Sequence, residues 1–341
     1  MKGKIIVTGA AGFIGFHLCK RLITDGFYVI GIDNLNSYYD LELKKARLNE
    51  IKKTLNSGKQ RWIFIQADIE NKEKIDEIFK EYRPNAVVHL AAQAGVRYSL
   101  ENPITYLNSN LLGFGIILES CRQYSIKNLL YASSSSVYGG NTKTPFSEED
   151  TVNHPVSLYA ATKKANELMA HSYSHLYKIS CTGMRFFTVY GPWGRPDMAP
   201  ILFTKSILDK KPIQIFNYGK ISRDFTYIDD AIESIMRLLK KPSCPDLNFN
   251  KSKPNPSSSW APYMIINIGN SNSIPVLDFV NLLEKELGIE AIKEFIPMQP
   301  GDVKSTSANT DKLESWISFK PSTNIEIGIK NFVKWYLNYY H

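Results

Sequence analysis

A glycine-rich turn near the N-terminus limits most strongly how this chain can fold. The apolar run 4–8 leads into residues 9–15 (GAAGFIG), and apolar periodicity predicts a helix over 12–25. Glycines allow a tight strand-to-helix turn and let backbone N–H groups approach a pyrophosphate, which the positive end of the helix also attracts. The context predicts a dinucleotide-binding βαβ unit, although the same glycines would also suit a purely structural turn.

The next predicted strand, 28–33, supports the first interpretation because it ends in Asp33, eighteen residues beyond Gly15. A carboxylate at this place accepts hydrogen bonds from the hydroxyls of an adenine ribose and repels a 2′-phosphate. The pattern therefore favours NAD over NADP.

Short apolar runs alternate with amphipathic stretches through the first half of the chain, which is typical of parallel strands with crossover helices. We predict an α/β fold, with a Rossmann-type doubly wound parallel sheet and a smaller C-terminal substrate-binding lobe. The NAD-binding domain is expected over 1–187, with later segments returning to it, and the nucleotide-sugar lobe mainly over 188–341. Further strands are predicted at 62–67, 86–90, 129–133, 180–187 and 213–216, and further helices at 72–82, 106–124 and 158–177. Five prolines between residues 242 and 262 predict a surface loop.

Composition narrows the classes of partner. The 341 residues carry 41 Lys and Arg against 33 Asp and Glu, a formal net charge of +8, and the basic residues are scattered rather than clustered. This distribution fits a small anionic ligand better than a nucleic acid. The four cysteines and six histidines lack metal-ligand or CxxC spacing, so we expect neither a metal site nor a disulfide framework. No signal-peptide core or run of about 18 apolar residues is present, and we expect a cytoplasmic protein without a membrane partner.

Candidate catalytic residues follow two predicted elements. Tyr159 and Lys163 are four residues apart in the helix predicted over 158–177 and so share one face. An ammonium beside a phenol favours the tyrosinate, which would let Tyr159 act as a base near neutral pH. The serine run 133–136 ends a predicted strand, at the sheet edge where ligands bind. Taken alone, the Tyr159–Lys163 spacing would also fit a pair on the protein surface. The serine run alone would also fit a flexible linker.

Five motifs in this order resemble the extended short-chain dehydrogenase/reductase family of nucleotide-sugar enzymes. They are the turn 9–15, the segment 89–93 (HLAAQ), the serine run before 137–139 (VYG), the Tyr159–Lys163 pair and 185–187 (RFF). The segments 33–40, 94–99 and 222–230 are most similar to UDP-glucuronate 4-epimerases. The likeness spans nearly the whole chain.

The resemblance implies a mechanism. Tyr159 would take the proton of the sugar 4-hydroxyl while C4 gives hydride to NAD⁺, and the hydride would return to the opposite face of the 4-keto sugar. Lys163 would bind the nicotinamide ribose and tune Tyr159, and Ser134 would share the 4-oxygen. The implied NAD contacts are Gly9, Gly12, Phe13, Ile14, Gly15, Asp33, Asn34, Asp68, Ile69, Leu90, Ala91, Ala92, Asn110, Tyr159 and Lys163.

The substrate side is also implied by the resemblance. Arg223 matches a diphosphate-binding arginine, Arg195 is a weaker candidate for the same region and Arg97 weaker still. Asp302 matches an acid that receives the uridine ribose, although each of these could instead form a surface ion pair. The implied substrate contacts are Ser134, Ser135, Ser136, Thr188, Arg195, Arg223 and Asp302.

The reaction type depends on the residues before Val137. Related dehydratases and decarboxylases have an acid there, whereas this chain has Ser135 and Ser136, which favours epimerisation and suits a substrate carboxylate. Thr188 lies where many neutral-sugar epimerases have Asn.

We therefore expect 4-epimerisation of UDP-glucuronate to UDP-galacturonate for polysaccharide biosynthesis. The alternatives are a 4-epimerase of a neutral or N-acetylated UDP-hexose and a non-catalytic NAD-binding protein. A homodimer through helices 106–124 and 158–177 is also implied. His89 is expected to be packed structure, since it ends a predicted buried strand and has no evident partner in the sequence.

Overall fold

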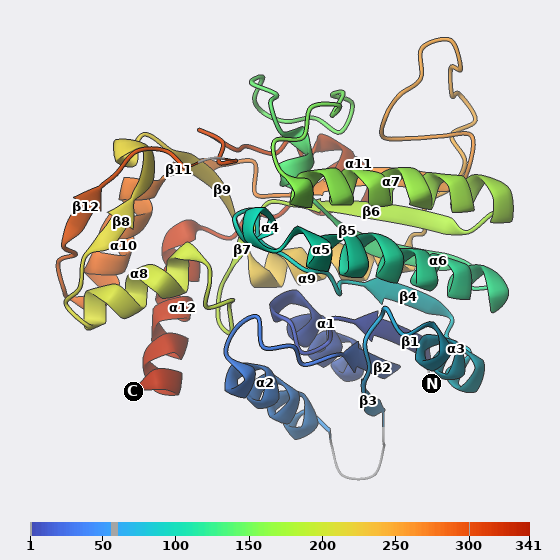
Figure 1. The fold of residues 1–341 in the computed structure, drawn as a ribbon, viewed down its shortest axis with the longest axis horizontal. Coiled ribbons are helices and arrows are strands. Elements are labelled where there is room, and N and C mark those ends of the chain that lie inside the picture. The colour runs from blue at the N-terminus through green and yellow to red at the C-terminus, as the bar shows by residue number, and fades with distance from the viewer. Residues whose placement is uncertain (1, 56–60, 300) are drawn as a thin grey trace.

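The computed structural model describes residues 2–55, 61–299 and 301–341. Within them, seven parallel strands form the central sheet in the order β10-β6-β5-β4-β1-β2-β3 (Figure 1). The order reverses between β1 and β4, which defines a doubly wound sheet and confirms the predicted fold class. The strands are β1 (Lys2–Thr8), β2 (Phe27–Asp33), β3 (Trp62–Gln66), β4 (Ala86–His89), β5 (Asn128–Ser134), β6 (Ser180–Phe186) and β10 (Tyr263–Ile268).

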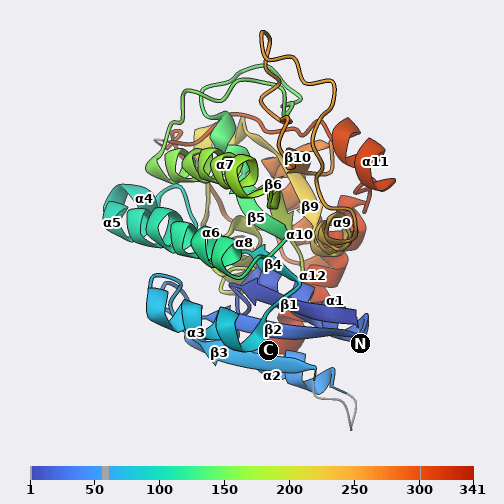
Figure 2. The ribbon, with the colours of Figure 1, turned by 90° about the vertical axis from the view of Figure 1, so that its right-hand side faces the viewer.

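Helices cover both faces of this sheet (Figure 2). The central strands are apolar and buried, because helices on both sides remove each face from water. One face carries α3 (Lys72–Tyr82), α6 (Phe114–Gln123) and α7 (Leu158–Tyr177). The other carries α1 (Phe13–Thr24), α9 (Ile228–Lys240) and α11 (Asp311–Ile317), and α2 (Leu41–Lys53) packs beside α1.

A smaller lobe lies beyond the carboxyl ends of the strands (Figure 1). The chain enters it directly after β6 and returns to the main sheet with α9 and then β10. Phe225 and Phe279 stack in its core with ring centres 4.5 Å apart. Its elements are β7 (Thr188–Tyr190), β9 (Ser222–Tyr227) and β11 (Ser273–Pro275) in one sheet, the pair β8 (Ile213–Ile215) and β12 (Lys293–Phe295), and helices α8 (Ala199–Leu208), α10 (Val276–Leu287) and α12 (Ile325–Tyr340).

The helix predicted over 106–124 differs in detail. The structure has α4 (Tyr98–Glu101), α5 (Pro103–Tyr106), a π-helical segment η1 (Leu107–Gly113) and then α6. Asn110, within η1, accepts a hydrogen bond from the Gln93 N–H (2.8 Å) and donates to the Gln93 carbonyl (3.1 Å). Through Asn110, the π-helical segment thus supports the loop that follows β4.

Two further features concern the rest of the chain. Residues 242–262 contain neither helix nor strand, as predicted for the proline-rich loop. In the part of the chain that the structure describes, no helix combines the length and apolarity that a membrane crossing requires.

Candidate active site

A cavity of about 790 Å³ lies between the carboxyl edge of the main sheet and the smaller lobe. The glycine turn, the ends of β2, β4 and β5 and the first turns of α7 line one side. The smaller lobe contributes Arg195, Arg223 and Asp302 to the other. This is the edge at which a doubly wound sheet binds ligands.

The glycine turn forms a close-fitting cradle at one end of the cavity. Gly9 has a positive φ of 73°, and a Cβ there would lie 2.8 Å from the Ala91 nitrogen. A Cβ on Gly15 would overlap the Gly9 carbonyl oxygen. No side chain caps α1 at Gly12, so its first-turn N–H groups face the cradle. The turn fits the pyrophosphate of a dinucleotide.

Asp33 lies beside this cradle at the end of β2. Its Oδ2 accepts from the Ala11 N–H (3.1 Å) and its Oδ1 from the Leu35 N–H (2.9 Å), and each oxygen keeps acceptor capacity for a ribose hydroxyl. The neighbouring Asn34 amide donates to Asp68 (2.9 Å).

Most of the predicted NAD contacts line the cavity, and two lie behind its wall. The lining residues are Gly9, Gly12, Phe13, Ile14, Gly15, Asp33, Asn34, Ile69, Leu90, Ala91, Ala92, Tyr159 and Lys163. Asp68 instead supports Asn34, and Asn110 supports Gln93. Contacts of all these residues with NAD remain predictions.

Tyr159 and Lys163 reach the cavity from the first turns of α7, where Ser157 caps the helix by accepting from the Ala160 N–H (3.1 Å). Lys163 is buried and donates to the Ala132 carbonyl at the end of β5 (3.0 Å). Burial lowers the pKa of Lys163 to about 8. Burial raises the pKa of Tyr159, while the Ser134 hydroxyl and the Arg195 guanidinium lower it. Tyr159 therefore depends on nearby donors and positive charge to ionise.

The serine run turns at the end of β5 and carries three hydroxyls to the cavity. Ser134 Oγ accepts from the Ser136 N–H (3.1 Å) and donates to Ser136 Oγ (3.1 Å). Ser135 and Thr188 also line the cavity. The serine run and Thr188 therefore present neutral hydroxyls to the cavity that Tyr159 also lines.

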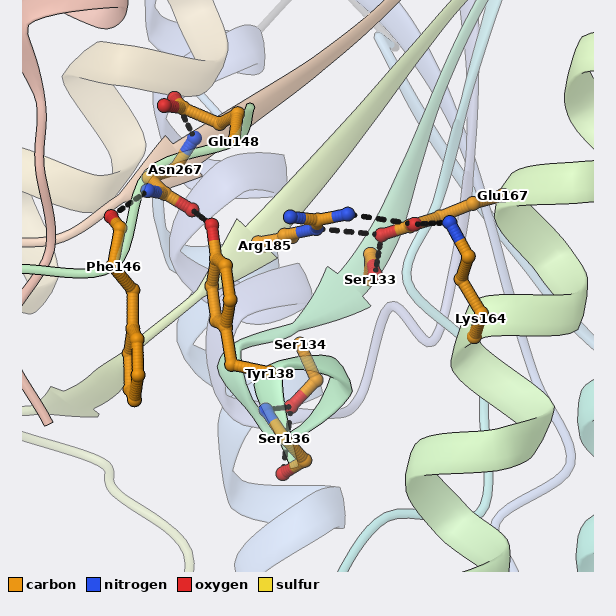
Figure 3. A network of polar contacts seen from close by, with 10 residues as sticks. All are labelled: Ser133, Ser134, Ser136, Tyr138, Phe146, Glu148, Lys164, Glu167, Arg185 and Asn267. Carbon is orange, nitrogen blue, oxygen red and sulfur yellow. Dashed lines mark hydrogen bonds and ion pairs between the residues drawn. The ribbon is translucent and has the colours of Figure 1, made fainter. Parts of the chain in front are cut away.

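A buried ion pair fixes α7 to the sheet behind these residues (Figure 3). Arg185 on β6 donates through Nε and Nη2 to the two carboxylate oxygens of Glu167, at 2.8 and 2.9 Å. Ser133 donates to the same carboxylate (2.7 Å), and Lys164 approaches it to 3.2 Å. The pKa of Glu167 is lowered because these partners outweigh its burial.

A second group of contacts continues this network. The Arg185 guanidinium lies 4.8 Å from the centre of the Tyr138 ring, and the Tyr138 hydroxyl donates to Asn267 on β10 (2.7 Å). Asn267 donates in turn to the Phe146 carbonyl and to Glu148 (Figure 3). The loop after the serine run is thereby joined to the main sheet.

Charged side chains gather at the substrate end of the cavity. Arg223 donates to the carbonyls of Ser222 (2.9 Å) and Lys304 (3.3 Å), and burial lowers its pKa. Asp302 accepts from Arg97 (3.1 Å), whose guanidinium covers the Phe216 ring.

Arg195 forms an ion pair with Asp197 as well as lining the cavity. The structure thus places Arg195, Arg223 and Asp302 around one space, with Arg195 and Asp302 also engaged in ion pairs.

His89 is packed, as expected. The structure adds a partner that the sequence did not show, because its Nδ1 lies 2.8 Å from the Thr8 hydroxyl on the adjacent strand β1. Burial lowers the pKa of His89 to about 3, so the ring is neutral. The partner was not predictable because the two residues are 81 positions apart and meet only when β1 and β4 pair.

Sequence reasoning also missed cavity residues that carry no local motif of their own. Tyr38, Lys44 and Asp197 line the cavity. The tyrosine-rich segment 33–40 was the available signal, but its pattern does not show which way its rings point.

The fold and the site together define a dinucleotide-dependent enzyme with a Tyr–Lys–Ser set beside its cofactor cradle. Residues 5–250 match the model of the NAD dependent epimerase/dehydratase family. The chain is 54% identical to the protein CapI of Staphylococcus aureus, over 99% of each chain. It is 47% identical to UDP-glucuronate 4-epimerase 4 of Arabidopsis thaliana, over 98% of this chain and 76% of that one.

Solved structures are similar as well. The crystal structure of a UDP-glucuronic acid 4-epimerase from Bacillus cereus, in complex with UDP-glucuronic acid and NAD, aligns with a TM-score of 0.85 at 34% identity, over 99% of this chain and 100% of that one. The chain belongs to the NAD dependent epimerase/dehydratase family. The predictions of a Rossmann-type epimerase and of NAD as its cofactor are confirmed.

Proposed function

We propose that the protein catalyses NAD-dependent 4-epimerisation of UDP-glucuronate to UDP-galacturonate. The observation that carries the proposal is that one cavity holds the glycine cradle, the Tyr159–Lys163–Ser134 set and the arginines of the smaller lobe. NAD bound in the cradle supplies the hydride-accepting ring for chemistry at the sugar C4. The relatives named for this reaction support the same substrate.

The protein side of the reaction is proton transfer and orientation. Tyr159 takes the proton of the 4-hydroxyl and later returns it, and Lys163 holds positive charge beside it. Ser134 donates to the 4-oxygen. Arg223 binds the diphosphate. Asp302 gives up its contact with Arg97 and binds the uridine ribose instead.

We attribute the preference for a uronate substrate to neutral hydroxyl groups in the cavity. Ser135, Ser136 and Thr188 line the same cavity as Tyr159 and can donate to a substrate carboxylate. None of the three is an acid or base that would promote elimination or decarboxylation. The residues at these positions therefore favour epimerisation over elimination or decarboxylation.

Substrate comparison tests this proposal. We expect a higher kcat/KM for UDP-glucuronate than for UDP-glucose or UDP-N-acetylglucosamine in coupled assays. Ser135→Ala should raise KM for UDP-glucuronate and leave that for UDP-glucose unchanged. Better turnover of a neutral sugar nucleotide would assign the enzyme to that substrate instead, and no turnover of any of them would favour a non-catalytic NAD-binding protein.

We further propose that the enzyme is a homodimer. Helices α6 and α7 lie side by side on one flank of the molecule (Figure 2). Leu168 and Leu176 on α7 are 62% and 60% exposed, and Leu112 in η1 is 54% exposed. Pairing this flank with a second copy would bury these side chains between four helices.

The cellular setting is also proposed. Cys19, Cys121, Cys181 and Cys244 are free thiols, which suits the reducing cytoplasm. UDP-galacturonate is an activated sugar, and we assign the reaction to the supply of precursors for polysaccharide biosynthesis.

A further inference from the structure

The loop after β7 carries Arg195 to the cavity, and a residue from the opposite wall helps to hold it there. Arg195 Nε donates to Asp197 Oδ1 (3.0 Å), and its Nη2 approaches Oδ2 (2.5 Å). The Tyr38 hydroxyl, from the segment between β2 and α2, donates to the same Oδ2 (3.1 Å). One carboxylate oxygen is therefore shared between a cation and a phenol.

The backbone of this loop is fixed by other contacts. Arg47 on α2 is fully buried and donates to the carbonyls of Trp193 (2.7 Å) and Gly194 (2.9 Å). It also donates to the Tyr39 hydroxyl (2.7 Å). Arg47 thus holds the loop backbone through contacts that do not involve Tyr38, whose hydroxyl contacts the Asp197 side chain.

Arg195 and Tyr159 line the same cavity, and the positive charge of Arg195 lowers the pKa of Tyr159. Lys163 lies one turn along the same helix, Ser134 faces Tyr159 from β5, and the neutral Tyr106 ring from α5 lies 6.0 Å away. The charge of Arg195 reaches Tyr159 and favours its ionised form. How far Asp197 neutralises Arg195 therefore affects the base.

Tyr38 is suited to limit that neutralisation. Burial and the adjacent Asp197 raise the pKa of Tyr38 to about 12, so it stays a hydrogen-bond donor at any working pH. A hydrogen bond donated to a carboxylate oxygen draws negative charge away from its other partners. Tyr38 is also wedged beside Gly95 and the Tyr98 ring, which fixes the direction of its hydroxyl.

We infer that Tyr38 and Asp197 are positioning residues that hold the Arg195 guanidinium beside Tyr159 with its charge only partly neutralised. They act through Arg195 and need not touch the substrate. The inference rests on the proposed function, because it assumes that Tyr159 is the base.

The test is the pH profile of kcat with UDP-glucuronate for two variants. Asp197→Asn removes the counter-charge, so the pH midpoint below which activity falls should move down by about one unit. Tyr38→Phe leaves Asp197 to neutralise Arg195 more fully, so the same midpoint should move up by about half a unit. Opposite displacements are the expected signature, because loss of packing would lower kcat without moving the midpoint in two directions.

Tyr39→Phe is the matched control, since it removes a neighbouring hydroxyl that contacts Arg47 instead of Asp197. Its midpoint should equal that of the wild type. Unchanged midpoints in both test variants, or displacements in the same direction, would overturn the inference while wild-type turnover upholds the proposed function. A wild-type protein that does not turn over UDP-glucuronate would refute the proposed function itself.

Discussion

Glu167 and Arg185 form a buried, two-point ion pair that joins helix α7 to the neighbouring strand β6, with N–O distances of 2.8 and 2.9 Å. Both side chains are fully buried. Glu167 lies one turn beyond Lys163, and its carboxylate also receives the Ser133 hydroxyl next to Ser134. These contacts thus connect α7, which carries Tyr159 and Lys163, with the end of β5, which carries Ser134.

Glu167→Gln should destabilise the protein by about 3 kcal/mol, because it leaves the Arg185 charge buried without a counter-ion. Urea denaturation at pH 7 measures this change. Glu119→Gln is the control, since Glu119 pairs with Arg122 at the surface and should matter little. Equal stability of the two variants would show that the buried pair does not fix α7.

Tyr159→Phe should reduce kcat by about 10³-fold or more, because the 4-hydroxyl loses its proton acceptor. The cradle is unchanged, so the purified variant should keep the same NAD content as the wild type. Activity within tenfold of the wild type would exclude Tyr159 as the base.

The pH dependence above neutrality should reflect Lys163. With a pKa of about 8, the side chain is charged at pH 7 and becomes neutral as the pH rises through 8. Because the ammonium favours the tyrosinate, kcat should fall over this range. In Lys163→Arg the charge persists, so the falling limb should move to higher pH even where the rate is lower. If kcat fell at the same pH in the wild type and in Lys163→Arg, the result would contradict the proposed role of the Lys163 charge.

Gly15→Ala should release NAD, because the added methyl group would overlap the Gly9 carbonyl and force the cradle open. NAD content after gel filtration is the measurement. Gly115→Ala on α6 is the control, since the nearest atom to its Cβ, Met169 Cε, lies at 3.4 Å. Full NAD retention in the Gly15 variant would argue against binding at this turn.

The double variant Leu168→Glu and Leu176→Glu should be monomeric, because charges on the exposed flank of α7 would oppose pairing with a second copy. Light scattering should give twice the chain mass of 38.8 kDa for the wild type and the single mass for the variant. A wild-type protein of single mass would refute the homodimer.

The fold was predictable from sequence where local pattern decides it. The turn at Gly9, Asp33 at the end of β2 and the helix around Tyr159 each follow from residues close together in the chain, and the structure has the corresponding elements. The π-helical turn around Asn110 was not predictable, because such turns are rare and no residue type marks them locally in the sequence.

The missed contacts depend on long-range pairing. Tyr38 and Asp197 are 159 residues apart, and only the packing of the smaller lobe against the sheet brings them together. Their residue types alone carry no signal of that contact. The resemblance to a known family pointed to the site motifs, but it did not identify the side chains, such as Tyr38 and Asp197, that contact the site residues.

The most direct test of the central claim is proton NMR of UDP-glucuronate incubated with purified protein and no added NAD. We predict new anomeric and H4 signals of UDP-galacturonate, because the cradle retains its cofactor and regenerates it in each turnover. Unchanged spectra, even after NAD is supplied, would contradict the account.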